Sequence, residues 1–182
     1  MQINDPQRRR GRECGVAATR RGGFGEAGFR SEAPMNRKLK AFILKEMKGH
    51  NAMTVATVRK DGWPQATTVV YANDGLDLYF VCDRDSQKAR NIARCSKVSV
   101  TIDGDSKDWG KTRGLSLAAS AKVLKRPAEI TAALKHLARK FSELADIGTA
   151  DPTELAVIKL TPKIISAIDY RKGFGHTDLV RV

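Results

Sequence analysis

Two short turn signals divide the middle of this sequence into strand-length segments. Lys60-Asp61-Gly62 and Asn73-Asp74-Gly75 each place Asp-Gly between runs rich in β-branched and aromatic residues. Asp-Gly is typical of a tight hairpin turn, because glycine adopts positive φ without steric cost. We therefore expect strands at Ala52–Val58, Gln65–Ala72 and Leu76–Cys82, joined as a three-stranded antiparallel meander.

Helical periodicity and further strand-length runs surround these segments. Apolar residues share one face of a predicted helix over 36–49, namely Leu39, Phe42, Ile43 and Met47. A second helix is expected to begin at a cap formed by Asp85 or Ser86 and to end near Arg94. Two strands, Lys97–Asp103 and Leu115–Leu124, should follow it, separated by a loop at Gly104–Thr112. The last expected elements are a helix from Pro127 to about Gly148 and the strands Leu155–Leu160 and Ile164–Tyr170. Strands joined mainly by short turns, with helices outside, predict a mainly β, α+β fold built on a small antiparallel barrel.

The first 34 residues differ in composition from the rest. They hold seven Arg and four acidic residues, are rich in glycine and contain few branched aliphatic side chains. Such a segment cannot bury enough apolar surface to offset the entropy of ordering, so we predict a disordered basic tail. A translation start at Met35 is the alternative interpretation. Residues 35–182 are expected to form one domain.

Composition narrows the class of protein. The net charge of +13 suggests binding to polyanions, but the basic residues are spread along the chain and aromatic residues make up only 6% of it. Nucleic-acid binding is therefore only a minor alternative. No apolar run is long enough to span a membrane and no secretory signal is visible, so we expect a cytoplasmic protein without a membrane partner. Cys14, Cys82 and Cys95 lack metal-ligand spacing, and no metal site is predicted.

The helix expected after the third strand begins with Ser86-Gln87-Lys88. A helix N-terminus presents free backbone N–H groups and a partial positive charge, so a lysine is misplaced there unless an anion shares the site. We interpret the three residues as a candidate phosphate site. The alternative is that Ser86 is an ordinary helix cap and Lys88 a solvated lysine. No Walker loop, HExxH or nucleophile motif competes with the phosphate site.

Three other features have simpler structural interpretations. Thr67 and Thr68 are adjacent in a strand, so their side chains point to opposite faces and at most one can enter a given pocket. Three aspartates, Asp103, Asp105 and Asp108, do not fit a calcium-loop spacing. His176 directly follows Gly173-Phe174-Gly175, in a segment that we expect to be a C-terminal turn.

The order of elements and the phosphate site resemble the pyridoxamine 5′-phosphate oxidase-like, FMN-binding split-barrel family. The resemblance spans about Met35 to Val182, most specifically in MTVATVRKDGWPQATTVVY, YFVCDRDSQKARNIAR, DWGKTRGLSLAASAKV and IDYRKGFGHTDLV. It implies an antiparallel split β-barrel that forms a homodimer and holds FMN at the subunit interface. By resemblance, Ser86, Gln87 and Lys88 match a Ser-Arg-Lys phosphate motif, Val81 and Cys82 flank it, and the isoalloxazine ring follows Thr67, Thr68, Val69 and Val70.

The same resemblance implies an FMN-dependent oxidoreductase whose substrate is unknown and for which no catalytic residue is assigned. True pyridoxamine-phosphate oxidases carry Arg and Lys where this chain has Thr67 and Ala72, and Arg where it has Gln87. The substrate segment rich in Trp and Arg is also missing from the C-terminus. We therefore do not expect vitamin B6 oxidation.

A non-catalytic protein is the alternative function. The same cleft of a stress-related split barrel could hold flavin, a deazaflavin or haem. Haem requires an axial ligand, for which His176 is the candidate.

Overall fold

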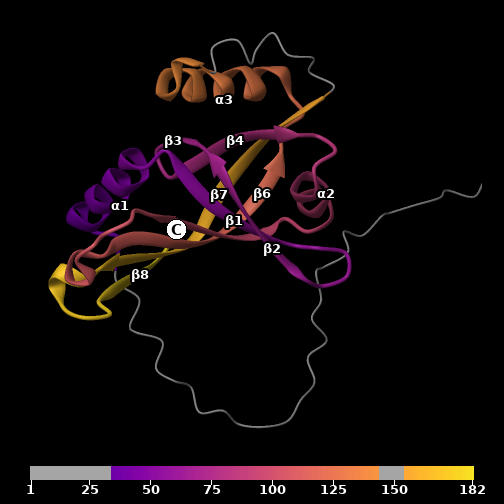
Figure 1. Ribbon diagram of the computed structural model, residues 1–182. Coiled ribbons are helices and arrows are strands. Elements are labelled where there is room, and N and C mark those ends of the chain that lie inside the picture. Colours follow the sequence, from indigo (N-terminus) through magenta and orange to yellow (C-terminus); the bar gives the residue numbers. More distant parts are fainter. Residues whose placement is uncertain (1–33, 144–153) are drawn as a thin grey trace, which may run out of the picture.

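The computed structural model describes residues 34–143 and 154–182 (Figure 1). All but the last residue of the predicted tail at 1–34 therefore lies outside the described residues. The elements are α1 (Arg37–Gly49), β1 (Ala52–Val58), β2 (Pro64–Val70), β3 (Ala72–Asp74), β4 (Asp77–Asp83), α2 (Gln87–Arg94), β5 (Lys97–Asp103), β6 (Arg113–Val123), α3 (Pro127–Lys140), β7 (Leu155–Asp169) and β8 (Thr177–Arg181). A short 3-10 helix, Trp109–Lys111, lies in the predicted loop before β6.

The described strands form one antiparallel sheet of eight strands in the order β2-β1-β5-β6-β7-β4-β3, with β8 paired to β7. The sheet curls so that its two ends approach each other, and Cα atoms of β2 and β4 come within 8 Å. The three helices lie outside the curled sheet (Figure 1). The predicted mainly β fold, an antiparallel barrel with flanking helices, is confirmed. Among the described residues, no helix combines the length and apolar character needed to cross a bilayer.

The predicted three-stranded meander is wrong. The β1–β2 hairpin forms as expected, with Ala52 opposite Val70. The expected return strand Gln65–Ala72 ends at Val70, however, and β3 and β4 form a second hairpin at the other end of the sheet. The break occurs at Tyr71, whose side chain is fully buried and whose hydroxyl donates to the Met47 carbonyl at 2.7 Å. Anchoring Tyr71 in the core redirects the chain between the two hairpins.

The end of the chain also differs from the prediction. The two strands expected at Leu155–Leu160 and Ile164–Tyr170 are one strand, β7, which continues through Pro162. The pairing register with β6 shifts between Ala118 and Ala119, next to that proline, so the sheet absorbs the missing N–H without ending the strand. The expected C-terminal turn is followed by a further strand, β8, after Gly173 and Gly175 reverse the chain at φ 131° and 70°.

The helix predicted from Pro127 to about Gly148 is also shorter than expected. α3 ends at Lys140, because Phe141 has an extended backbone with φ −133° and ψ 100°. The positions expected at its end, from 144 to 148, lie outside the described residues.

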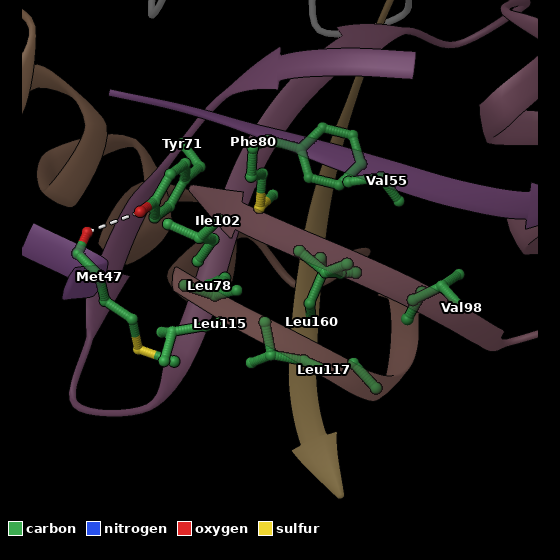
Figure 2. Close-up of a cluster of buried hydrophobic side chains, with 14 of the residues drawn as sticks. Met47, Val55, Tyr71, Leu78, Phe80, Val98, Ile102, Leu115, Leu117 and Leu160 are labelled. Carbon is green, nitrogen blue, oxygen red and sulfur yellow. Dashed lines mark hydrogen bonds between the residues drawn. The ribbon is translucent and has the colours of Figure 1, made fainter. Parts of the chain in front are cut away.

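The core fills the inside of the curled sheet (Figure 2). Alternate residues of β1, β4, β5 and β6 point inward, and Val55, Phe80 and Ile102 are at most 1% exposed. Met47 of α1 closes one end of this core, beside Tyr71. Burial raises the pKa of the Tyr71 phenol well above its usual value, so the hydroxyl stays a neutral donor to Met47. The tight core gives the outer elements fixed positions.

Candidate functional site

The start of α2 presents an arrangement suited to an anion. Ser86 caps the helix, and its hydroxyl accepts a hydrogen bond from the Ala89 N–H at 3.3 Å. The N–H groups of Gln87 and Lys88 lie in the first turn and have no intrahelical acceptor. No acidic residue occupies this turn. A ligand oxyanion would therefore find free donors and a favourable helix dipole.

Cys82 of β4 lies against the same helix start. The Ser86 hydroxyl donates to the Cys82 sulfur at 3.6 Å. Burial raises the pKa of the Cys82 thiol, and the hydrogen bond from Ser86 and the nearby charge of Lys88 oppose that effect only in part. The structure thus brings Cys82, Ser86 and Lys88 together, with the thiol neutral at neutral pH.

Among the described strands, β2 lies at the edge of the sheet, and one side of its backbone pairs with none of them. The Tyr71 N–H donates to the Asn51 carbonyl and the Arg59 N–H to the Trp63 carbonyl, which sets the hydrogen-bonded pairs between β1 and β2. Because these pairs alternate along an antiparallel ladder, Thr67 and Val69 bond to β1. The backbone N–H and C=O groups of Thr68 and Val70 consequently point away from β1, toward the free edge.

The side chains of the same strand follow the expected alternation. Val69 is buried and Thr67 half-buried on the inner face, whereas Thr68 and Val70 are exposed on the outer face. The Thr67 hydroxyl oxygen is buried and has no hydrogen-bond partner among the described residues. An unpaired buried hydroxyl is costly. It marks a position where a ligand or a second chain would supply the missing bond.

β4 contributes the opposing edge. Its pairing with β3 ends at Tyr79, whereas its pairing with β7 continues through Val81 and Cys82. Val81 and Cys82 therefore have one open side, and the facing strands β2 and β4 are close in space. The two open edges and the start of α2 together outline the candidate site.

The side chain of Gln87 belongs to a different part of the structure. It donates to Asn91 at 2.9 Å and accepts from Arg90 at 3.3 Å. Asn91, only 2% exposed, also donates to the Thr57 hydroxyl at 3.0 Å and to the Gln65 side chain at 3.1 Å. This network ties α2 to the β1–β2 hairpin. We did not predict Asn91 as a supporting residue, although its spacing of four residues from Gln87 is a signal that the two share a helix face.

His176 lies far from this arrangement within one chain. Its neighbour Thr177 pairs with Ile168 of β7, whereas Val81 pairs with Val157. Eleven residues of strand separate those positions, which corresponds to about 35 Å. The His176 ring contacts Asp178 at 3.2 Å. Across residues 34–143 and 154–182, no group of three or more His, Cys, Asp or Glu side chains is arranged to hold a metal ion.

Comparison with protein families gives one match over most of the chain. The family model for pyridoxamine 5′-phosphate oxidase matches residues 35–169, which include β2, β4 and α2. No curated protein matches the sequence.

Solved structures share the fold at low sequence identity. A haem-binding protein from Mycobacterium smegmatis is 22% identical with a TM-score of 0.63, over 75% of this chain and 57% of that one. The haem storage protein HutZ from Vibrio cholerae is 20% identical with a TM-score of 0.57, over 65% and 87%. A Clostridium acetobutylicum protein related to general stress protein 26, of the pyridoxinephosphate oxidase family, is 12% identical with a TM-score of 0.62, over 81% and 97%. The chain thus spans just over half the length of the mycobacterial protein, and these likenesses show the fold alone.

Proposed function

This chain belongs to the pyridoxamine 5′-phosphate oxidase family, and we propose that it binds FMN at the start of α2 and the facing edges of β2 and β4. What supports the proposal is that the start of α2 offers first-turn N–H groups and the Lys88 charge, while β2, whose Cα atoms come within 8 Å of β4, carries the unpartnered Thr67 hydroxyl. Among residues 34–143 and 154–182, Lys88 has no ion pair and the Thr67 hydroxyl no hydrogen bond, and FMN offers both an anionic phosphate and polar ring and chain atoms.

Each residue that the sequence predicts for the site then has a role toward FMN. Ser86, Gln87 and Lys88 would hold the phosphate, Gln87 through its backbone N–H because its side chain bonds to Asn91. Val81 and Cys82 would line the opposite edge with a neutral surface. The open N–H and C=O groups of Thr68 and Val70 would bond to the polar edge of the ring, while Thr67 and Val69 would support it from the inner face.

The reaction that we propose is a two-electron oxidation or reduction of a small molecule. When bound, the flavin supplies the electron-transfer chemistry, and the protein orients the ring and excludes water from one of its faces. Vitamin B6 oxidation is not part of the proposal, since Thr67, Ala72 and Gln87 replace the charged residues of true oxidases.

We propose a homodimer in which a second copy covers the outer face of β1, β2, β5 and β6. This face carries small side chains, and a groove of about 640 Å³ there is lined by Ala56, Val58, Pro64, Ser99, Ala118 and Lys163. Val70, at the edge of the same face, is 46% exposed. Small side chains permit close approach of a second sheet, and the open β2 edge would then lie at the subunit boundary.

The visible spectrum of the purified protein tests the cofactor directly. We expect flavin absorbance, release of FMN identified by mass after denaturation, and a solution mass of two chains. A colourless protein that does not take up added FMN would contradict the proposal. A monomer that binds FMN tightly would contradict the proposed dimer but not the proposed cofactor.

Haem binding is the second candidate, favoured by the haem-binding and haem storage proteins among the structural neighbours. His176 is the candidate axial ligand; its ring is about one-third exposed and contacts Asp178. A Soret band that disappears in His176→Ala would support haem, whereas flavin as the sole bound chromophore would exclude it from the purified protein.

Thr67→Val tests whether the buried hydroxyl contacts the cofactor. Valine keeps the shape of threonine and removes an unpaired polar atom, so we expect the protein without FMN to be unchanged or more stable by up to about 1 kcal/mol. Loss of a hydrogen bond to the flavin should weaken FMN binding by about 3- to 10-fold. Thermal unfolding and FMN titration check the two parts. Thr131→Val, at an exposed position of α3 away from the proposed flavin site and dimer face, is the control.

A further inference from the structure

A second cavity, of about 590 Å³, lies between the β1–β2 turn and the side of α2. Of the described residues, four cationic ones line it, Arg59 and Lys60 from the turn and Arg90 and Arg94 from the helix, and Asp61 is the one carboxylate. The lining therefore carries a formal charge of +3. The side chain of Gln87 at the start of α2 also lines this cavity, so it adjoins the proposed phosphate site, but neither Ser86 nor Lys88 is part of its lining.

Most of this positive charge has no carboxylate partner. Asp61 pairs with Arg59 at 2.8 Å, which leaves Lys60, Arg90 and Arg94 without an ion pair to any described residue. Arg90 donates to the Asp85 carbonyl and to Gln87, and Arg94 donates to the Val58 carbonyl at 2.6 Å. These neutral acceptors hold the guanidinium groups in place without cancelling their charge.

Another cavity of the same protein shows the opposite pattern. A cavity of about 450 Å³ beside α1 is also lined by three cations, Lys111, Arg113 and Arg171. Each of these has a carboxylate partner, at 3.1, 3.6 and 2.7 Å respectively. The cavity beside α1 thus has its cations paired, whereas three of the four cations of the cavity beside α2 have no ion pair to a described residue.

The positions of Arg90 and Arg94 carry an electrostatic cost. They are four residues apart on α2, so their side chains share one helix face, and like charges at this spacing repel. A polyanion between them would relieve the repulsion and form charge-assisted hydrogen bonds with both guanidinium groups.

An exposed aromatic side chain on the β1–β2 turn indicates that the ligand carries a planar ring as well as phosphates. Trp63 is 71% exposed and does not line the cavity itself, but its N–H donates to the Asp61 carboxylate at 3.3 Å and its carbonyl accepts from the Arg59 N–H at 2.9 Å, and both of these residues do line it. Exposed indoles offer a stacking surface for a nucleobase. We propose that this cavity binds the nucleoside diphosphate part of a small molecule, with the phosphates at Arg90 and Arg94 and the base against Trp63.

Calorimetric titration of the full chain with ADP and with pyrophosphate tests the proposal. We expect Arg90→Gln/Arg94→Gln to weaken binding of both ligands by at least about tenfold. Trp63→Ala should weaken binding of ADP by about 5- to 50-fold and leave pyrophosphate unchanged. The matched control is Lys135→Gln/Arg139→Gln, which removes two exposed cations at the same spacing from α3 and should change neither affinity.

Several results would overturn the proposal. These are no binding of ADP at low salt, an equal loss in the control variant, or a Trp63→Ala protein that binds ADP normally. Displacement of ADP by FMN would assign the cavity to the flavin phosphate instead. Tighter binding of a short oligonucleotide than of ADP would indicate a nucleic acid. If NADPH binds at least as tightly as ADP, the diphosphate belongs to a pyridine dinucleotide. If NADPH binds more weakly than ADP, the ligand is a free nucleotide.

Discussion

Lys88→Ala should weaken FMN binding by about 10- to 100-fold and change riboflavin binding by less than about threefold. The two ligands differ only in the phosphate, so the comparison isolates the group that Lys88 would contact. Loss of one charge-assisted hydrogen bond, about 1.5–3 kcal/mol, corresponds to this range of affinity. Fluorescence titration with each ligand measures both constants on the same preparation.

Two controls make the result specific to position 88. Lys45→Ala removes an exposed lysine from α1 and should leave both affinities unchanged. Salt should weaken FMN binding to the original protein more than to Lys88→Ala, because the variant has lost one charge at the site. Equal losses for FMN and riboflavin would show that Lys88 is not at the phosphate.

Asn91→Leu should destabilise the protein by about 2–4 kcal/mol and lower its melting temperature by about 5–12 °C. Leucine is close to asparagine in size but cannot bond to Thr57, Gln65 or Gln87, so it leaves their polar groups without partners in a buried position. Because the network ties α2 to the β1–β2 hairpin, FMN affinity should fall as well. Thermal unfolding with and without FMN measures both effects.

Asn51→Leu is the matched control for this prediction. Asn51 is exposed, and its contact with Tyr71 uses only the backbone carbonyl, so stability should change by less than about 0.5 kcal/mol. An Asn91→Leu protein as stable as the original would mean that the network contributes nothing to the position of α2.

Local signals in the sequence predicted most of the elements correctly. The Asp-Gly turn between Val58 and Pro64 and the alternation in Lys97–Asp103 gave the right strands, and Ser86 proved to be the cap of α2. Such signals depend on a few neighbouring residues, through turn geometry, side-chain alternation and capping. The resemblance to a family, based on short motifs around these elements, was confirmed over residues 35–169.

Partners distant in sequence could not be predicted in the same way. The order of strands depends on where Tyr71 is buried, and the continuity of β7 depends on how β6 accommodates Pro162. Likewise, the open edges of β2 and β4 exist because other strands occupy their opposite sides.

The sequence by itself thus determined most of the elements, the family and the residues at the start of α2. Only the tertiary structure decided that Thr67 has an unpaired hydroxyl, that Gln87 turns toward Asn91, and that Arg90 and Arg94 keep uncompensated charge. Local structure follows from the conformational preferences of adjacent residues, whereas hydrogen-bond satisfaction and charge compensation depend on groups that only folding brings together.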